Sequence, residues 1–119
     1  MALNVVNRYS APISVMVEYY HPACQDAGLS PWRKVGWYNI PPNSQKAVIL
    51  GNLAGLNRYW YFYAQATEGM RWQGPFRELV RSSAFQECAD LADNVHYRWI
   101  GMTELDVDGG ADYFLVLTA

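Results

Sequence analysis

The sequence predicts an all-β protein, an antiparallel β-sandwich of seven or eight short strands, and three observations support this fold class. Apolar and polar residues alternate with a period of two through most of the chain, as in strands that bury one face. Turn signals recur about every ten residues, a spacing typical of sandwiches and barrels. No stretch alternates strands with long helical patterns, which disfavours βαβ units. The length of 119 residues corresponds to a single β-sandwich domain, 1–119.

The strongest strand pattern is residues 58–66, where three tyrosines alternate with Trp60, Phe62 and Ala64. The turn at 39–44 contains two prolines, which exclude a central strand there. Residues 3–9 are expected to belong to the fold. The other expected strands cover residues 13–20, 35–37, 46–50, 95–107 and 113–118.

Two local predictions concern the second half of the chain. Residues 82–93 begin with a serine cap and place Phe85, Cys88 and Leu91 at helical spacing, which predicts a short helix. A strand around Phe85 followed by a turn is the alternative. Asp-Gly-Gly at 108–110 lies between two alternating runs, and this predicts a hairpin that joins the last two strands.

The composition excludes several classes of protein. The chain is 51% hydrophobic and 17% charged, which is typical of a folded core and not of a disordered chain. A formal net charge of −2 offers no electrostatic basis for binding nucleic acid. No apolar run is long enough for a membrane span, and the first residues lack a signal-peptide pattern. We therefore expect a protein that is cytoplasmic or part of an assembled particle.

The two cysteines, Cys24 and Cys88, are compatible with one disulfide or with two free thiols. Neither belongs to a metal-binding or redox motif. The interpretation favoured by the sequence is a pair of reduced, buried thiols in an intracellular protein.

Several segments resemble a bacterial family known as domain of unknown function 1036. They are Gly36–Ser44, Arg58–Ala64, Trp72–Gly74, Gly101–Asp106 and Val6–Ser10. The resemblance covers most of the chain and implies a β fold. It implies no activity and no catalytic residue.

This chain departs from that family at its cysteines. Family members usually have cysteine where this chain has Val6 and Gln45, and another near Leu79 or Val80. The loss of several cysteines together agrees with a protein without disulfides.

An acidic cluster near the C-terminus is a candidate metal site formed by Glu104, Asp106, Asp108 and Asp112. Its first half imitates an EF-hand loop, but Leu115 stands where that loop requires a bidentate glutamate. The favoured interpretation is a solvated strand face that leads into a turn, with no bound metal.

No catalytic residue is predicted, and no cofactor. His21 lies three residues before Cys24, but this spacing belongs to no known nucleophile motif. The sequence also lacks a phosphate-binding glycine loop and a nucleophile elbow. We therefore expect a protein that is not an enzyme.

Aromatic and arginine residues are the most distinctive feature of the chain. It contains five Trp, nine Tyr and seven Arg but only two Lys, and Trp, Tyr and Arg dominate binding hot spots. The favoured hypothesis is a structural or interaction protein, a self-associating subunit of a larger assembly. The alternative is a lectin-like carbohydrate-binding module that uses exposed rings, helped by Asn39 and Gln73. The interface or ligand residues expected are Arg58, Tyr59, Tyr61, Tyr63, Trp32, Trp37 and Trp72.

Overall fold

The structure is a computed structural model that describes residues 2–50, 58–89, 97–107 and 112–119. These residues form ten strands and one short helix. The elements are β1 (Ala2–Asn7), β2 (Ile13–Tyr20), α1 (Pro22–Asp26), β3 (Trp32–Ile40), β4 (Ser44–Leu50), β5 (Tyr59–Ala66), β6 (Arg71–Trp72), β7 (Phe76–Arg81), β8 (Phe85–Cys88), β9 (Tyr97–Asp106) and β10 (Tyr113–Leu117).

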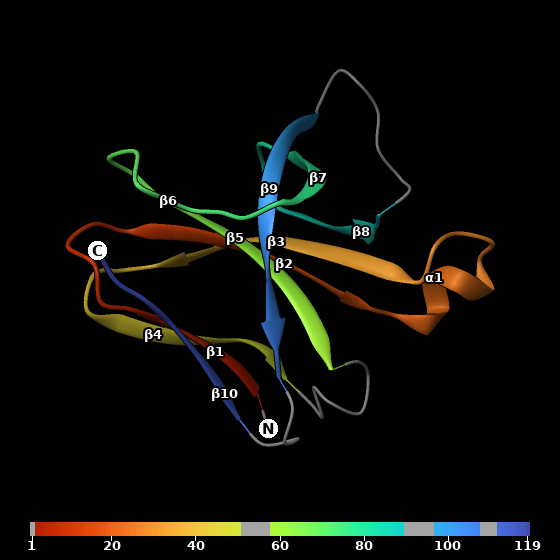
Figure 1. Ribbon diagram of the computed structural model, residues 1–119, viewed down its shortest axis with the longest axis horizontal. Coiled ribbons are helices and arrows are strands. Elements are labelled where there is room, and N and C mark those ends of the chain that lie inside the picture. The colour runs from red at the N-terminus through yellow and green to blue at the C-terminus, as the bar shows by residue number, and fades with distance from the viewer. Residues whose placement is uncertain (1, 51–57, 90–96, 108–111) are drawn as a thin grey trace.

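The strands form two sheets, and the predicted all-β fold class is confirmed (Figure 1). The smaller sheet has the order β10-β1-β4. The larger has the order β7-β9-β5-β2-β3-β8, with β6 added beside β5. Two features differ from the prediction: the described residues form ten strands instead of seven or eight, and β1 pairs with β10 in parallel.

The main core lies between the two sheets. Leu3 and Val5 of β1 face Val15, Trp60 and other apolar residues of the larger sheet, and all four are fully buried. Period-two alternation produces this arrangement, because every second side chain of a strand points to the same face. The larger sheet therefore turns one face toward the smaller sheet.

The opposite face of the larger sheet, which we call the inner face, has its own apolar cluster. Met16, Tyr63, Phe85 and Met102 belong to it. The sheet curls over this cluster, since β7 contacts β3 although three strands separate them in the sheet order. Lys34 Nζ donates to the carbonyl of Leu79 at 2.6 Å.

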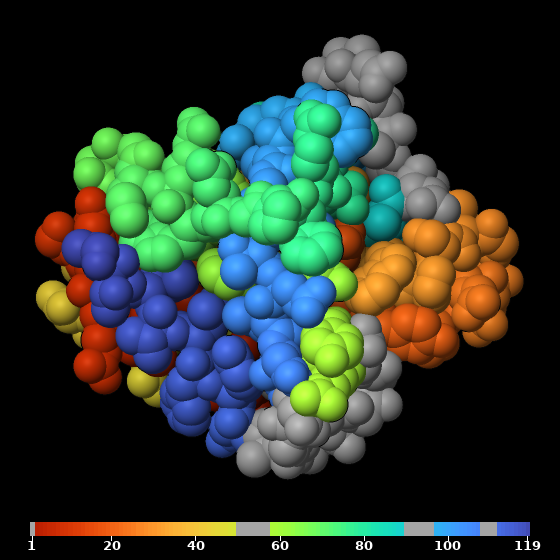
Figure 2. Space-filling view, in the orientation of Figure 1, coloured from red at the N-terminus to blue at the C-terminus, as the bar shows by residue number. Residues whose placement is uncertain are grey.

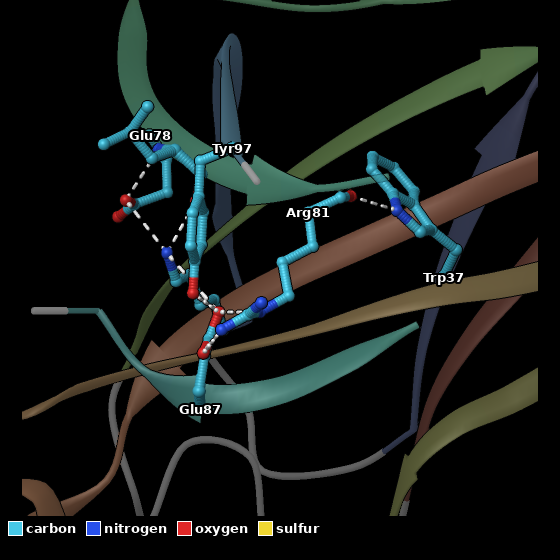
Figure 3. Close-up of polar contacts among 7 residues, drawn as sticks. Trp37, Glu78, Arg81, Glu87 and Tyr97 are labelled. Carbon is cyan, nitrogen blue, oxygen red and sulfur yellow. Dashed lines mark hydrogen bonds and ion pairs between the residues drawn. The ribbon is translucent and has the colours of Figure 1, made fainter. Parts of the chain in front are cut away.

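Polar contacts hold the curled end in place (Figure 3). Trp37 Nε1 donates to the carbonyl of Arg81 at 2.8 Å, and the Arg81 guanidinium pairs with Glu87 of β8. The Tyr97 hydroxyl also donates to Glu87, at 2.6 Å. In Figure 2 the segment that contains β6 and β7 lies over β9 on this side of the molecule.

The predicted helix at 82–93 is wrong where the structure describes it. Phe85–Cys88 is strand β8, paired antiparallel with β3, as the alternative interpretation had it. Pairing with β3 and burial of Phe85 outweigh the local helical spacing. Residues 90–93 lie outside the described part of the chain. The helix that does form is α1, one turn at Pro22–Asp26.

The predicted hairpin between the last two strands is also wrong. β9 pairs with β5 and β7 in the larger sheet, whereas β10 pairs with β1 in the smaller one. Leu105 and Leu115 both point into the core between the sheets, so the two strands face each other across it instead of sharing a sheet. The Asp-Gly-Gly turn at 108–110 lies outside the described residues.

The cysteines form a disulfide, which corrects the expectation of free thiols. The sulfurs of Cys24 and Cys88 are 2.09 Å apart, and the bond links α1 to the end of β8. Sixty-four positions separate the two residues in the chain, so sequence spacing alone did not reveal the pairing. The part of the chain that the structure describes includes no helix with the length and apolarity needed to cross a bilayer.

Candidate functional site: a groove lined by arginines

A row of polar side chains crosses the end of the inner face. Ser14 of β2 is the register partner of Asn39 on β3 and of Gln65 on β5, and Gln65 is the partner of Arg71 on β6. Register partners point to the same face of a sheet, so these four side chains stand side by side. Their neighbours Ile13 and Ala64 point to the core, which fixes the row on the inner face.

Two adjoining hollows lie over this row. The larger has a volume of about 590 Å³ and is walled by Trp37, Arg98 and the turn between β7 and β8. The smaller, of about 240 Å³, includes Gln73, Arg77 and Trp99 in its lining. Arg71 and Arg98 line both hollows, so the two form one continuous site. We call the two hollows together the arginine groove.

The side chain of Arg98 is held in place within the groove. Its Nη2 donates to Gln65 Oε1 at 2.8 Å, and its guanidinium carbon lies 5.7 Å from the ring centroid of Trp37. The ring of Trp37 is itself fixed by its bond to Arg81 and by edge contacts with Tyr63 and Phe85. Arg98 is therefore positioned before any ligand arrives.

The smaller hollow contains a second pair of a cation and a ring. The guanidinium carbon of Arg77 lies 4.6 Å from the ring centroid of Trp99, whose residue surface is 56% exposed. Such a pair gives the hollow a flat apolar surface with a positive charge above it.

Hydrogen-bond donors outnumber acceptors in the groove. The Ser14 hydroxyl donates to Asn39 Oδ1 at 2.8 Å, and Gln65 Oε1 accepts from both Tyr63 and Arg98. Besides these occupied oxygens, the side-chain amides of Asn39 and Gln65, which line the larger hollow, each carry an NH2 group that can donate to a ligand. A ligand rich in oxygen acceptors matches this lining.

Four of the residues that sequence reasoning proposed for ligand binding line the groove. Trp37 and Asn39 line the larger hollow, and Gln73 lines the smaller. Tyr63 also lines the smaller hollow, but its side chain is almost completely buried. It supports Gln65 and does not form an exposed platform.

The remaining proposed residues lie elsewhere. Arg58 forms a bidentate pair with Asp106, at 2.8 and 2.9 Å, and lies over the ring of Tyr59. Trp72 packs edge-on against Tyr9 and donates to the Thr118 carbonyl at 3.0 Å. Trp72 is thus a packing residue. The proposed tyrosines and tryptophans therefore do not all lie at one site.

Trp32 and Tyr61 line a third hollow of about 250 Å³ toward the other end of the inner face, and this hollow shares Arg77 with the smaller hollow of the groove. Glu18 also lines it, and the Oε1 atom of this buried carboxyl has no hydrogen-bond partner. Burial, followed by the neighbouring carboxyl of Glu78, raises the pKa of Glu18 to about 9, against the opposing effect of Lys34. Burial and Glu104 likewise raise the pKa of the Tyr61 hydroxyl.

The predicted acidic metal candidates do not converge where the structure describes them. Asp106 is engaged by Arg58, and Glu104 accepts a hydrogen bond from Tyr61 at 3.2 Å. Asp108 lies outside the described residues. Asp112, Glu104 and Asp106 belong to no group of three or more ligating side chains among the residues described.

Sequence reasoning did not identify the three arginines that line the groove. Arg71, Arg77 and Arg98 come from three different strands, and only the pairing of β5 with β6 and β9, and of β7 with β9, brings them together. The excess of arginine over lysine was the one available signal, but it did not indicate which arginines lie together.

Comparisons with protein-family models, curated proteins and solved structures found no match for this chain. The resemblance to domain of unknown function 1036 therefore stays a prediction.

Proposed function

We propose that this protein is a non-catalytic carbohydrate-binding domain whose ligand lies in the arginine groove. The observation that carries the proposal is the row Arg71–Gln65–Ser14–Asn39, with Trp37 in the lining of the larger hollow and Trp99 in that of the smaller. Amide and guanidinium donors suit the hydroxyl and ring oxygens of a sugar, and an indole offers its apolar face to a sugar ring.

Two further observations agree with this proposal. Cys24, the one thiol near a histidine in the sequence, is bonded to Cys88 and so does not act as a nucleophile beside His21. Disulfides persist in oxidising compartments, and this favours a protein that meets extracellular carbohydrates over a cytoplasmic one.

Binding to a glycan array, followed by tryptophan fluorescence titration of the hits, tests the proposal. Replacing Asn39 with alanine removes donors from the groove floor, and we expect affinity to fall about three- to tenfold. Gln45→Ala is the matched control, an exposed amide on β4 of the other sheet, and should bind like the unmodified protein. An array without hits would contradict the proposal.

A second candidate, self-association, is favoured by the outer face of the smaller sheet. Phe114 and Val116 of β10 are 53% and 45% exposed, and Val6 of β1 stands beside Val116 on the same face. β10 is an edge strand among the described residues, and its sequence contains no charge and no proline to guard that edge. It lies at the surface of the molecule (Figure 2). The occupant we propose is a second copy of the chain, paired edge to edge.

Light scattering after size exclusion tests self-association. We expect a dimer that becomes a monomer when Val116 is replaced by lysine, because a charge on an edge strand opposes pairing. Lys46→Gln on β4, the other edge of this sheet, serves as the control and should leave the dimer intact. A monomer at high concentration in the unmodified protein would exclude this candidate.

A further inference from the structure

The arginine groove carries a positive charge that the whole protein does not have. The formal net charge of the chain is −2, yet Arg71, Arg77 and Arg98 line the groove. Among the described residues, no aspartate or glutamate lines either hollow, and none pairs with these three arginines. On the premise of the proposed function, we propose that the groove selects acidic sugars, whose carboxylate is bound by Arg71 and Arg98.

The placement of Arg98 explains why a carboxylate fits. One of its nitrogens is used by Gln65, and the guanidinium is stacked near both Trp37 and Tyr63, with centroid distances of 5.7 and 5.9 Å. A guanidinium keeps further N–H donors in its plane after one is used, and its fork geometry matches a carboxylate. Arg98 thus supplies a fixed, half-buried part of the binding site.

Arg71 supplies the adjustable half. Its side chain is exposed, and in the described part of the chain no hydrogen bond or ion pair holds it. Gln65 stands between Arg71 and Arg98, since it is the register partner of the first and the hydrogen-bond partner of the second. The two guanidinium groups therefore flank one position on the groove floor.

The groove is long enough for more than the charged group. From Arg71 to Asn39 the row crosses four adjacent strands, about 14 Å at the usual strand spacing. The donors of Asn39 lie at the end away from Arg71, where they reach uncharged hydroxyls. A sugar ring that carries a carboxylate at one end uses both parts of the row.

Long-range electrostatics separate this ligand from a nucleic acid. A polyanion is repelled by the net negative charge of the chain, whereas a small acidic sugar senses mainly the local field of the groove. Salt weakens the attraction between Arg71 and a carboxylate because Arg71 is exposed.

The test is calorimetric titration with three acidic sugars and their neutral methyl esters, namely galacturonate, glucuronate and N-acetylneuraminate. At least one free acid should bind about tenfold tighter than its own ester, since a hydrogen bond to a charged group is much stronger than one to a neutral group. That preference should shrink as sodium chloride is raised.

Matched variants test whether Arg71 is responsible for the preference for the acid over the ester. Arg71→Gln should lower affinity for the acid about tenfold and leave affinity for the ester unchanged. Lys46→Gln removes the same charge from the exposed surface of β4 and should change neither affinity.

Each contrary outcome has one meaning. Acid and ester that bind equally, with both weakened by Asn39→Ala, would overturn the preference for acidic sugars and leave carbohydrate binding standing. No binding by any acid, together with an array without hits, would overturn both proposals. Tighter binding of a mononucleotide such as AMP than of every acid would assign the groove to a different ligand class and overturn the preference.

Discussion

The carboxyl of Glu18 lies on the inner face of the larger sheet, where only 7% of the residue is exposed. The charged groups that act on it are Glu78 and Lys34, and the Nζ of this lysine is 3.7 Å from an oxygen of Glu78 and 3.9 Å from one of Glu87. Burial removes the ionised carboxylate from water and so favours the protonated form of Glu18. The neighbouring carboxyl of Glu78 acts in the same direction, Lys34 opposes both effects, and the pKa of Glu18 rises to about 9.

This raised pKa predicts how stability depends on pH. A carboxyl with an ordinary pKa near 4.5 when unfolded and about 9 when folded binds more protons in the folded state between those values. The free energy of unfolding should therefore fall as pH rises from 7 to 9, by at most about 1.4 kcal/mol per pH unit. This pH range lies above the one in which His21 titrates, because burial and the charge of Arg33 lower the pKa of His21.

Urea denaturation at several pH values from 7 to 9 measures the slope. Glu18→Gln keeps the shape of the side chain and removes its titration, so the slope should disappear and the variant should be the more stable protein at pH 9. Parallel profiles for the two proteins would contradict the assigned protonation.

At the residue scale, the sequence correctly predicted on which face of a strand a side chain lies. It did not predict which side chains of different strands contact one another. Alternation alone placed Ser14 opposite Ile13, and the lectin-like hypothesis named Trp37 and Asn39. Alternation did not reveal that Arg98 stacks near Trp37, because that contact joins β9 to β3 across the curl of the sheet.

At the scale of elements, close approach of two backbones shapes the groove wall. Gly74 and Gly101 lie so near each other that a Cβ added to Gly101 would clash with the carbonyl oxygen of Gly74. The amide of Gly74 also donates to the carbonyl of Gly101 at 3.2 Å. This approach holds the segment that carries Gln73 and Arg77 against β9.

Gly101→Ala should therefore push that segment away from β9. We expect the free energy of unfolding to fall by about 1–3 kcal/mol, the usual penalty for overpacking, and ligand affinity to fall as well. Glu104→Ala, at an exposed site of the same strand, is the control and should change stability by less than about 0.5 kcal/mol. A Gly101→Ala variant as stable as the unmodified protein would show that the close approach of the Gly74 and Gly101 backbones is not required for stability.

Strands were predicted correctly where a long local pattern specifies them. The prediction failed where pairing with a distant strand determines the structure. The strands at 13–20 and 58–66 were predicted almost to the residue, since their period-two pattern is long. β8 was predicted as a helix because a short apolar pattern fits both structures. The pairing of β10 with β1 joins the two ends of the chain, and no local signal announces it.

At the scale of the whole molecule, the Cys24–Cys88 bond closes a long loop. It ties α1 to β8, the strand at one edge of the larger sheet. A cross-link stabilises a fold mainly because it restricts the unfolded chain, and the effect grows with loop length. The 64-position separation places this bond among the long loops.

Reduction of the disulfide should lower the free energy of unfolding by about 2–4 kcal/mol. Urea denaturation with and without a reducing agent measures the change. The double variant Cys24→Ser with Cys88→Ser should unfold like the reduced protein and should not respond to the reducing agent. An unmodified protein that is equally stable before and after reduction would contradict this account.

The central claim is that a carbohydrate binds in the arginine groove, and the indole N–H signals of the five tryptophans test it most directly. Each signal is assigned by a Trp→Phe variant and followed by NMR during titration with an acidic sugar. Trp37 and Trp99 line the groove, whereas Trp60 is buried in the main core and Trp32 lines the third hollow and neither hollow of the groove. We predict that the signals of Trp37 and Trp99 move and those of Trp60 and Trp32 do not. Unchanged signals from Trp37 and Trp99, or movement of Trp32 alone, would contradict the claim.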